Sequence, residues 1–155
     1  MTEMVTGVDL IQEQLKIASG QGLGMRQEDV QLRGHAIECR INAEDPDKDF
    51  QPSPGLVELF VPPGGPGIRV DSACYSGYRI PPNYDSMIGK LLAHRETRRQ
   101  AIATMLRALD EFVITGPKTT IPIHRRILTH SDFRGGEHDT GFVERYFSSS
   151  HPRIS

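Results

Sequence analysis

A period-two pattern over RGHAIECRINAEDP, from Arg33 to Pro46, constrains the fold of this chain more than any other feature. In a β-strand, successive side chains point to opposite faces. One face of this segment would suit a core, since it carries His35, Ile37, Cys39 and Ile41. The opposite face would be more polar and carries Ala36, Glu38, Arg40 and Asn42. The segment is therefore predicted to be a strand with one buried face.

The rest of the chain predicts an α+β fold, in which helices pack on an antiparallel sheet. Period-two runs bounded by glycine and proline predict strands at 33–42, 56–61, 67–71, 77–80 and 87–93. Helices are predicted at 7–19 and 98–112, from Thr119 or Thr120 (the possible N-caps) to about Leu128, and at 141–147. Residues 130–139 are expected to form a loop, and 148–155 a disordered tail.

Composition excludes several classes of function. A formal net charge of −2 provides no basic surface for nucleic acid. No apolar run is long enough to span a bilayer and no signal peptide is present, so a cytoplasmic protein without membrane contact is expected. Two cysteines, Cys39 and Cys74, and six histidines lack the spacing of a zinc site or a disulfide framework. No metal site is therefore predicted.

Arg40 is the candidate site residue that the strand pattern itself offers. A guanidinium stays charged at any physiological pH and presents a planar fork of donors, which suits a carboxylate, a bicarbonate or another oxyanion. Glu38, two residues away on the same face, is placed to hold that fork. The alternative is a surface ion pair between these two side chains, worth about 0–1 kcal/mol. The pattern alone leaves both interpretations open.

A second candidate, Asp85, lies in NYDSMIGK (Asn83 to Lys90), where a turn leads into an apolar strand. Its carboxylate either contributes to a site or accepts hydrogen bonds from nearby backbone amides. The second role is common for aspartate in turns and is the favoured interpretation.

Several long motifs in the same order make the chain resemble the C-terminal portion of biotin carboxylase, and the bacterial acetyl-CoA carboxylase subunit is the most similar. The motifs are RGHAIECRINAEDP, PSPG, PPGGPGIRVDS, YDSMIGK and AIATMLRALDEFVITGPKT. The similarity runs from Thr2 to about Tyr146. It implies that residues 1–29 are the last helix and linker of an ATP-grasp domain, that 30–147 form the C-terminal domain, and that 148–155 are a tail.

The resemblance also implies a reaction. Biotin carboxylases use ATP and Mg²⁺ to activate bicarbonate, and transfer the carboxyl group to a ureido nitrogen of biotin on a carrier protein. The arginine of their ECRINAED motif, here Arg40, contacts bicarbonate and the biotin ureido oxygen, with Glu38 and Asp85 as supporting residues. The implied partners are a biotin carboxyl carrier protein, a carboxyltransferase and a second copy of the chain.

The sequence departs from the family pattern at several positions. The family's metal-binding glutamates, catalytic base and nucleotide-holding lysines precede the segment that this chain matches, so no ATP or metal ligand is assigned to it. Thr140 and Gly141 stand where the bacterial protein has an isoleucine–histidine pair at the adenine pocket. Pro66 replaces an interface phenylalanine of the bacterial homodimer, whereas Arg69 matches an interface arginine.

Two functions remain open on this basis. The chain either contributes Arg40 to a biotin carboxylase site that an ATP-grasp domain completes, and is inactive alone, or it is a non-catalytic module for dimerisation or docking in a carboxylase complex. In both cases the helix predicted at 7–19 has an apolar face of Val8, Ile11 and Leu15 that needs a partner. Self-association or modest stability is therefore expected.

Overall fold

The computed structural model describes residues 1–147, and its centre is a three-stranded antiparallel sheet. The strands lie in the order β1 (His35–Asn42), β8 (Met87–Arg95), β6 (Ile68–Ser72), so β1 and β6 are the edges. The predicted strand around Arg40 is confirmed. Across the sheet, Arg40 lies opposite Lys90, and Lys90 lies opposite Asp71. Because directly opposed residues share a face, these three side chains lie on the same side of the sheet.

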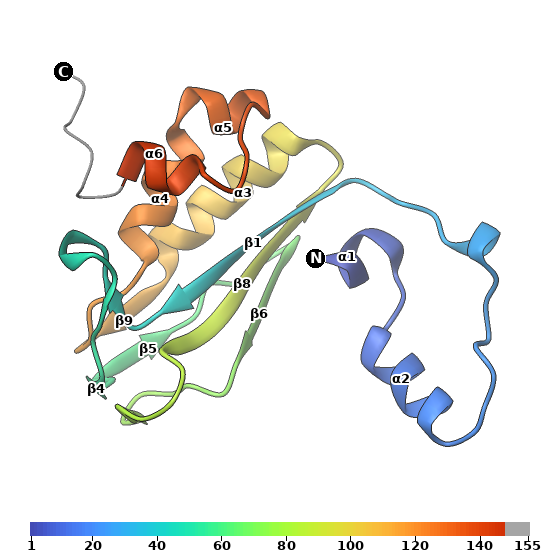
Figure 1. Ribbon diagram of the computed structural model, residues 1–155, viewed down its shortest axis with the longest axis horizontal. Helices are drawn as coiled ribbons and strands as arrows, with labels where there is room; N and C mark the ends of the chain where they lie inside the picture. The colour runs from blue at the N-terminus through green and yellow to red at the C-terminus, as the bar shows by residue number, and fades with distance from the viewer. Residues whose placement is uncertain (148–155) are drawn as a thin grey trace.

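Helix α3 (Arg98–Glu111) covers the other face and closes the core (Figure 1). A capping box begins the helix: the Thr97 hydroxyl accepts the Gln100 amide, and the Gln100 side chain accepts the Thr97 amide. Most buried residues of the helix and of the sheet belong to one core cluster, which includes Ile37, Cys39, Ile41, Leu91, Ala93, Ala101, Ile102, Met105, Ala108 and Leu109. The predicted helix at 98–112 is thus confirmed.

Three shorter helices follow: α4 (Ile121–Thr129), α5 (Ser131–Gly135) and α6 (Phe142–Phe147). They lie beside α3, away from α1 and α2 (Figure 1). Helix α5 corrects the loop expected at 130–139. It forms because the His130 ring nitrogen Nδ1 accepts the backbone amide of Asp132, which caps a turn of helix that apolar spacing did not reveal. Thr120 is the N-cap residue of α4, although its hydroxyl makes no capping hydrogen bond.

Three two-stranded ribbons and two 3₁₀ turns lie among the connecting segments of residues 1–147. The ribbons pair β2 (Glu44–Asp45) with β3 (Gln51–Pro52), β4 (Gly55–Leu56) with β7 (Arg79–Ile80), and β5 (Leu59–Val61) with β9 (Val113–Thr115). The turns are η1 (Gln27–Asp29) and η2 (Pro46–Lys48). The strand predicted at 56–61 is divided, because its two halves pair with different partners.

The segment before β1 contains two helices where one was predicted (Figure 1). Helix α1 (Thr2–Thr6) ends at Gly7, whose φ of 73° is left-handed and easily adopted by glycine. Helix α2 (Leu10–Ala18) begins after Asp9, whose carboxylate accepts a backbone amide of the first turn. The apolar face of α2 lies open, with Ile11 62% and Leu15 67% exposed.

The predicted division of the chain between residues 29 and 30 stays a prediction. The tail predicted at 148–155 lies outside the described residues. Among the helices within residues 1–147, none combines the length and the apolar character that a membrane crossing requires.

Candidate functional site

Arg40 lies near the end of β1 on the face that points away from the core. Its neighbours in sequence, Cys39 and Ile41, are only 4% and 0% exposed, so the pleat of the strand turns Arg40 outward. The side chain is exposed, and its guanidinium has no ion pair within residues 1–147. A guanidinium in this position is available to an anion from outside the described chain.

The backbone of Arg40 is held by the start of α4. The Thr120 hydroxyl donates to the Arg40 carbonyl at 3.0 Å and accepts the Asn42 amide at 3.0 Å. The Thr120 amide donates to the Asn42 carbonyl at 3.1 Å. One helical turn later, His124 Nε2 lies 2.8 Å from the same Arg40 carbonyl. The start of helix α4 is therefore hydrogen-bonded to the outer edge of β1 at Arg40.

His124 acts as a hydrogen-bond donor in this contact. A carbonyl oxygen only accepts, so the proton of the neutral ring must be on Nε2. Burial lowers the pKa of His124, and the hydrogen bond to the Arg40 carbonyl opposes this shift. The ring is thus neutral and correctly protonated for the contact at neutral pH.

The structure does not bring Glu38 and Arg40 together, although they share a strand face. Glu38 Oε2 lies 3.5 Å from the α-ammonium group of Met1. The residue opposite Arg40 is Lys90, a half-buried cation. The register thus places one further cation opposite Arg40, and the carboxylate of Asp71 follows on the other side of that lysine. The supporting role of Glu38 stays a prediction.

Asp85 lies in the loop before β8, where its Oδ1 accepts the Met87 amide at 2.9 Å. This is the turn contact that the favoured interpretation of the sequence expected. A role in a site stays a prediction.

A polar cluster that sequence analysis missed adjoins Arg40 along β1. The Ser86 hydroxyl donates to Glu44 Oε1, and Asn42 Nδ2 donates to the same oxygen at 3.1 Å. Within the described chain, Asn42 Oδ1 is buried without a hydrogen-bond partner. The alternation of the strand placed Asn42 beside Arg40, but Glu44 and Ser86 are separated by 42 positions and nothing in the sequence connects them.

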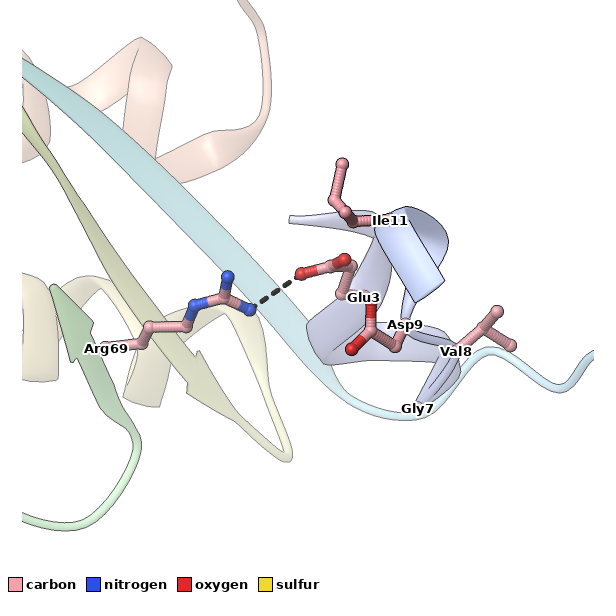
Figure 2. Close-up of a pocket in the computed structure, with 6 residues that line it drawn as sticks. All are labelled: Glu3, Gly7, Val8, Asp9, Ile11 and Arg69. Carbon is pink, nitrogen blue, oxygen red and sulfur yellow. Dashed lines mark hydrogen bonds and ion pairs between the residues drawn. The ribbon is translucent and has the colours of Figure 1, made fainter. Parts of the chain in front are cut away.

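Arg69 on β6 ties the first helix to the sheet. Its guanidinium pairs with Asp71 Oδ1 at 2.8 Å and with Glu3 Oε2 at 2.7 Å. These two hydrogen bonds raise the pKa of Arg69, and the one to Asp71 has the larger effect. Figure 2 shows the Glu3–Arg69 pair at a hollow, which is lined by Glu3, Gly7, Val8, Asp9, Ile11 and Arg69. The predicted place of Arg69 in a dimer interface stays a prediction.

No metal or nucleotide ligand is assigned within residues 1–147. These residues contain no group of three or more His, Cys, Asp or Glu side chains that could hold a metal ion. Gly141, one of the two residues that depart from the family's adenine-pocket pair, donates its amide to Asp139 Oδ1 at 3.0 Å just before α6.

Known proteins with similar sequences are carboxylase components. Residues 38–145 match the family described as the biotin carboxylase C-terminal domain. Biotin carboxylase 1 of Bacillus subtilis is 60% identical over 146 residues, which cover 94% of this chain and 32% of that protein. A pyruvate carboxylase component of Methanothermobacter thermautotrophicus is 53% identical, with 94% of this chain and 30% of that protein covered.

A solved structure with the same fold is the biotin carboxylase domain dimer of Hydrogenobacter thermophilus 2-oxoglutarate carboxylase, in complex with MgADP, ADP and bicarbonate. The TM-score is 0.89 at 47% identity, over 92% of this chain and 31% of that one. This chain thus spans about a third of the length of these relatives. The matched residues run from β1 to α6 and include Arg40 and helix α4, which contacts its backbone. The chain therefore belongs to the biotin carboxylase C-terminal domain family.

Proposed function

We propose that this chain forms part of the active site of a biotin carboxylase, in which Arg40 binds bicarbonate and the ureido oxygen of biotin. The observation that carries the proposal is the exposed guanidinium of Arg40 on a strand whose backbone is anchored at that residue. A planar fork of charged donors matches a carboxylate-like anion better than a point charge does. The register adds a second cation, Lys90, opposite Arg40.

The chemistry assigned to Arg40 is the stabilisation of developing negative charge. When a ureido nitrogen of biotin loses its proton and attacks the carboxyl donor, charge develops on the ureido oxygen. A fixed guanidinium donates to that oxygen more strongly in the transition state than in the ground state, so it accelerates the reaction. The buried neighbours Cys39 and Ile41 and the contacts to the Arg40 carbonyl keep the strand in place during this change.

The remaining components belong to the proposed complete enzyme. ATP and Mg²⁺ would be held by residues outside 1–147, and biotin on a biotin carboxyl carrier protein would accept the carboxyl group. A homodimer is proposed because the Hydrogenobacter relative is described as a dimer, and Arg69 is the residue proposed at the interface. The proposed assembly is a cytoplasmic acetyl-CoA carboxylase of fatty acid biosynthesis, with a carboxyltransferase as partner. Pyruvate and 2-oxoglutarate carboxylases are the alternatives that the relatives suggest.

A chimera tests the proposal. Residues 2–147 replace the matching part of Bacillus subtilis biotin carboxylase 1, and ATP hydrolysis that depends on both biotin and bicarbonate is measured. We expect the chimera to be active, and Arg40→Gln to lower kcat by about 10²- to 10³-fold, as removal of one preorganised donor does. Arg99→Gln, at an exposed position on α3, is the matched control and should leave kcat unchanged.

The outcomes separate the two candidate functions. Activity that does not respond to Arg40→Gln would contradict the role of Arg40. A chimera that folds cooperatively and stays inactive would favour the alternative, a non-catalytic module for dimerisation or docking within a carboxylase complex.

A further inference from the structure

We propose that Thr120 and His124 are positioning residues for Arg40: by fixing the backbone of β1 at this residue, they direct its guanidinium towards the substrate. The inference rests on the proposed function of Arg40. It concerns two side chains that contact the backbone carbonyl of Arg40 and that lie 80 and 84 positions away in the sequence.

The first step of the argument is that β1 needs support at this point. The strand is an edge of the sheet, so only β8 pairs with it in the sheet. The register of that pairing shifts between Ile41 and Asn42, one residue beyond Arg40. Such irregularities kink a strand and change the direction of nearby side chains. The orientation of Arg40 is therefore not determined by the sheet alone.

The second step is that Thr120 connects the two sides of this irregularity. Its hydroxyl donates to the carbonyl of Arg40 before the shift and accepts the amide of Asn42 after it, both at 3.0 Å. Its own amide donates to the Asn42 carbonyl at 3.1 Å. Thr120 is only 5% exposed, so water does not easily replace these hydrogen bonds. One side chain thus fixes the local geometry of β1.

The third step is that His124 adds an independent contact to the same carbonyl. Residues at i and i+4 of a helix lie on one face, so Thr120 and His124 approach β1 together. Nε2 of His124 lies 2.8 Å from the Arg40 carbonyl oxygen, which thereby receives two donors. A carbonyl with both lone pairs occupied has little freedom to rotate, and the Cα–Cβ bond of Arg40 is fixed with it.

Matched substitutions in the chimera test the proposal. Thr120→Val keeps the shape and removes the hydroxyl, whereas Thr120→Ser keeps the hydroxyl. His124→Leu removes the donor, whereas His124→Gln offers an amide N–H. Thr129→Val is the control, because that hydroxyl bonds only to carbonyls of its own helix. The measurements are kcat, the KM values for bicarbonate and biotin, and the melting temperature.

We expect Thr120→Val and His124→Leu to lower kcat about 10- to 100-fold, the range expected when a reacting group is misplaced. The serine and glutamine variants should recover most of this loss, and Thr129→Val should cause none. In an Arg40→Gln background, Thr120→Val should cause no further loss of kcat while it still lowers the melting temperature. This combination separates positioning from a purely structural role.

Several results would overturn the proposal. One is a folded Thr120→Val variant whose kcat is unchanged. Another is a loss of kcat on Thr120→Val that is equally large in the wild-type and Arg40→Gln backgrounds. A third is a Thr120→Ser variant with a kcat as low as that of Thr120→Val. An active chimera that ignores these substitutions rejects only the positioning role. A chimera that is inactive from the start rejects the proposed function, and the positioning role with it.

Discussion

At the scale of single residues, the two cysteines lie in different surroundings. Cys39, on the buried face of the strand that carries Arg40, is 4% exposed. Burial, followed by the nearby charge of Glu38, raises the pKa of its thiol to about 12. Cys74 is half-buried, and burial raises its pKa as well. Since the thiolate is the reactive form and a reagent must also reach it, the buried thiol should be inert.

We therefore expect a thiol reagent such as Ellman's reagent to modify Cys74 in the folded chain, and Cys39 only after denaturation. The reaction is followed by absorbance, and the modified peptide is identified by mass spectrometry. In Cys74→Ser the native-state reaction should disappear. Two thiols that react at equal rates without denaturant would show that Cys39 is more accessible than the structure indicates.

The sequence predicted the outward position of Arg40 well, but not the residues that hold its backbone. The alternation of buried and exposed positions is local, so it placed Arg40 on the outer face. Thr120 and His124 support Arg40 through the folded edge of the sheet, and Thr120 was expected only as a possible helix cap. Glu38 shares the strand face but contacts Met1, because period-two patterning specifies a face and not the direction of a long side chain.

At the scale of elements, the central strands and most helices were predicted correctly, including the short helices α4 and α6. Helix α5 was missed, and the division between α1 and α2 was not predicted. The helix at 98–112 and the central strands have enough residues for the period to be distinct. Helix α5 has five residues, too few for a period, and depends on a cap by His130. The segment predicted as one helix at 7–19 is divided, because α1 ends at Gly7 and Asp9 caps the start of α2 two residues later.

The connection after β9 provides a prediction at this scale. Gly116 has a left-handed φ of 105°, and a Cβ at this position would contact the carbonyl oxygen of Leu56. Gly116→Ala should therefore destabilise the fold by more than about 1 kcal/mol, since both the backbone angle and the contact oppose it. Urea denaturation measures this change.

Gly135→Ala is the matched control for this experiment. Gly135 has no atom within 4 Å of an added Cβ and lies in α5. Alanine there should be neutral or stabilise the fold by up to about 1 kcal/mol. Equal effects of the two alanine substitutions would contradict the conformation described for Gly116.

At the scale of the whole molecule, α2 presents the clearest exposed apolar surface. Its open residues are Leu10, Ile11, Leu15 and Ile17, which are 42%, 62%, 67% and 54% exposed. Helix α1, in contrast, is connected to the sheet through the Glu3–Arg69 ion pair and through the Val5 carbonyl, which accepts the Arg33 amide. An apolar helix face of this kind favours contact with another surface.

We expect the isolated chain to self-associate through α2. Sedimentation velocity should show a mass that increases with concentration, and Ile11→Glu together with Leu15→Glu should shift the protein towards the monomer. Leu32→Glu is the control, because Leu32 is 78% exposed but lies outside α2 and should not affect association. A wild-type chain that stays monomeric at every concentration would contradict this expectation.

The hydrogen bonds between the start of α4 and β1 also have a consequence for solubility. An edge strand of eight residues normally presents unpaired amides and carbonyls on which a foreign strand can grow into an amyloid-like ribbon. Here the carbonyl of Arg40 and the amide and carbonyl of Asn42 are already bonded to Thr120 and His124. The same two residues that we assign to orientation of the arginine thus also protect this end of the edge strand from pairing with a foreign strand.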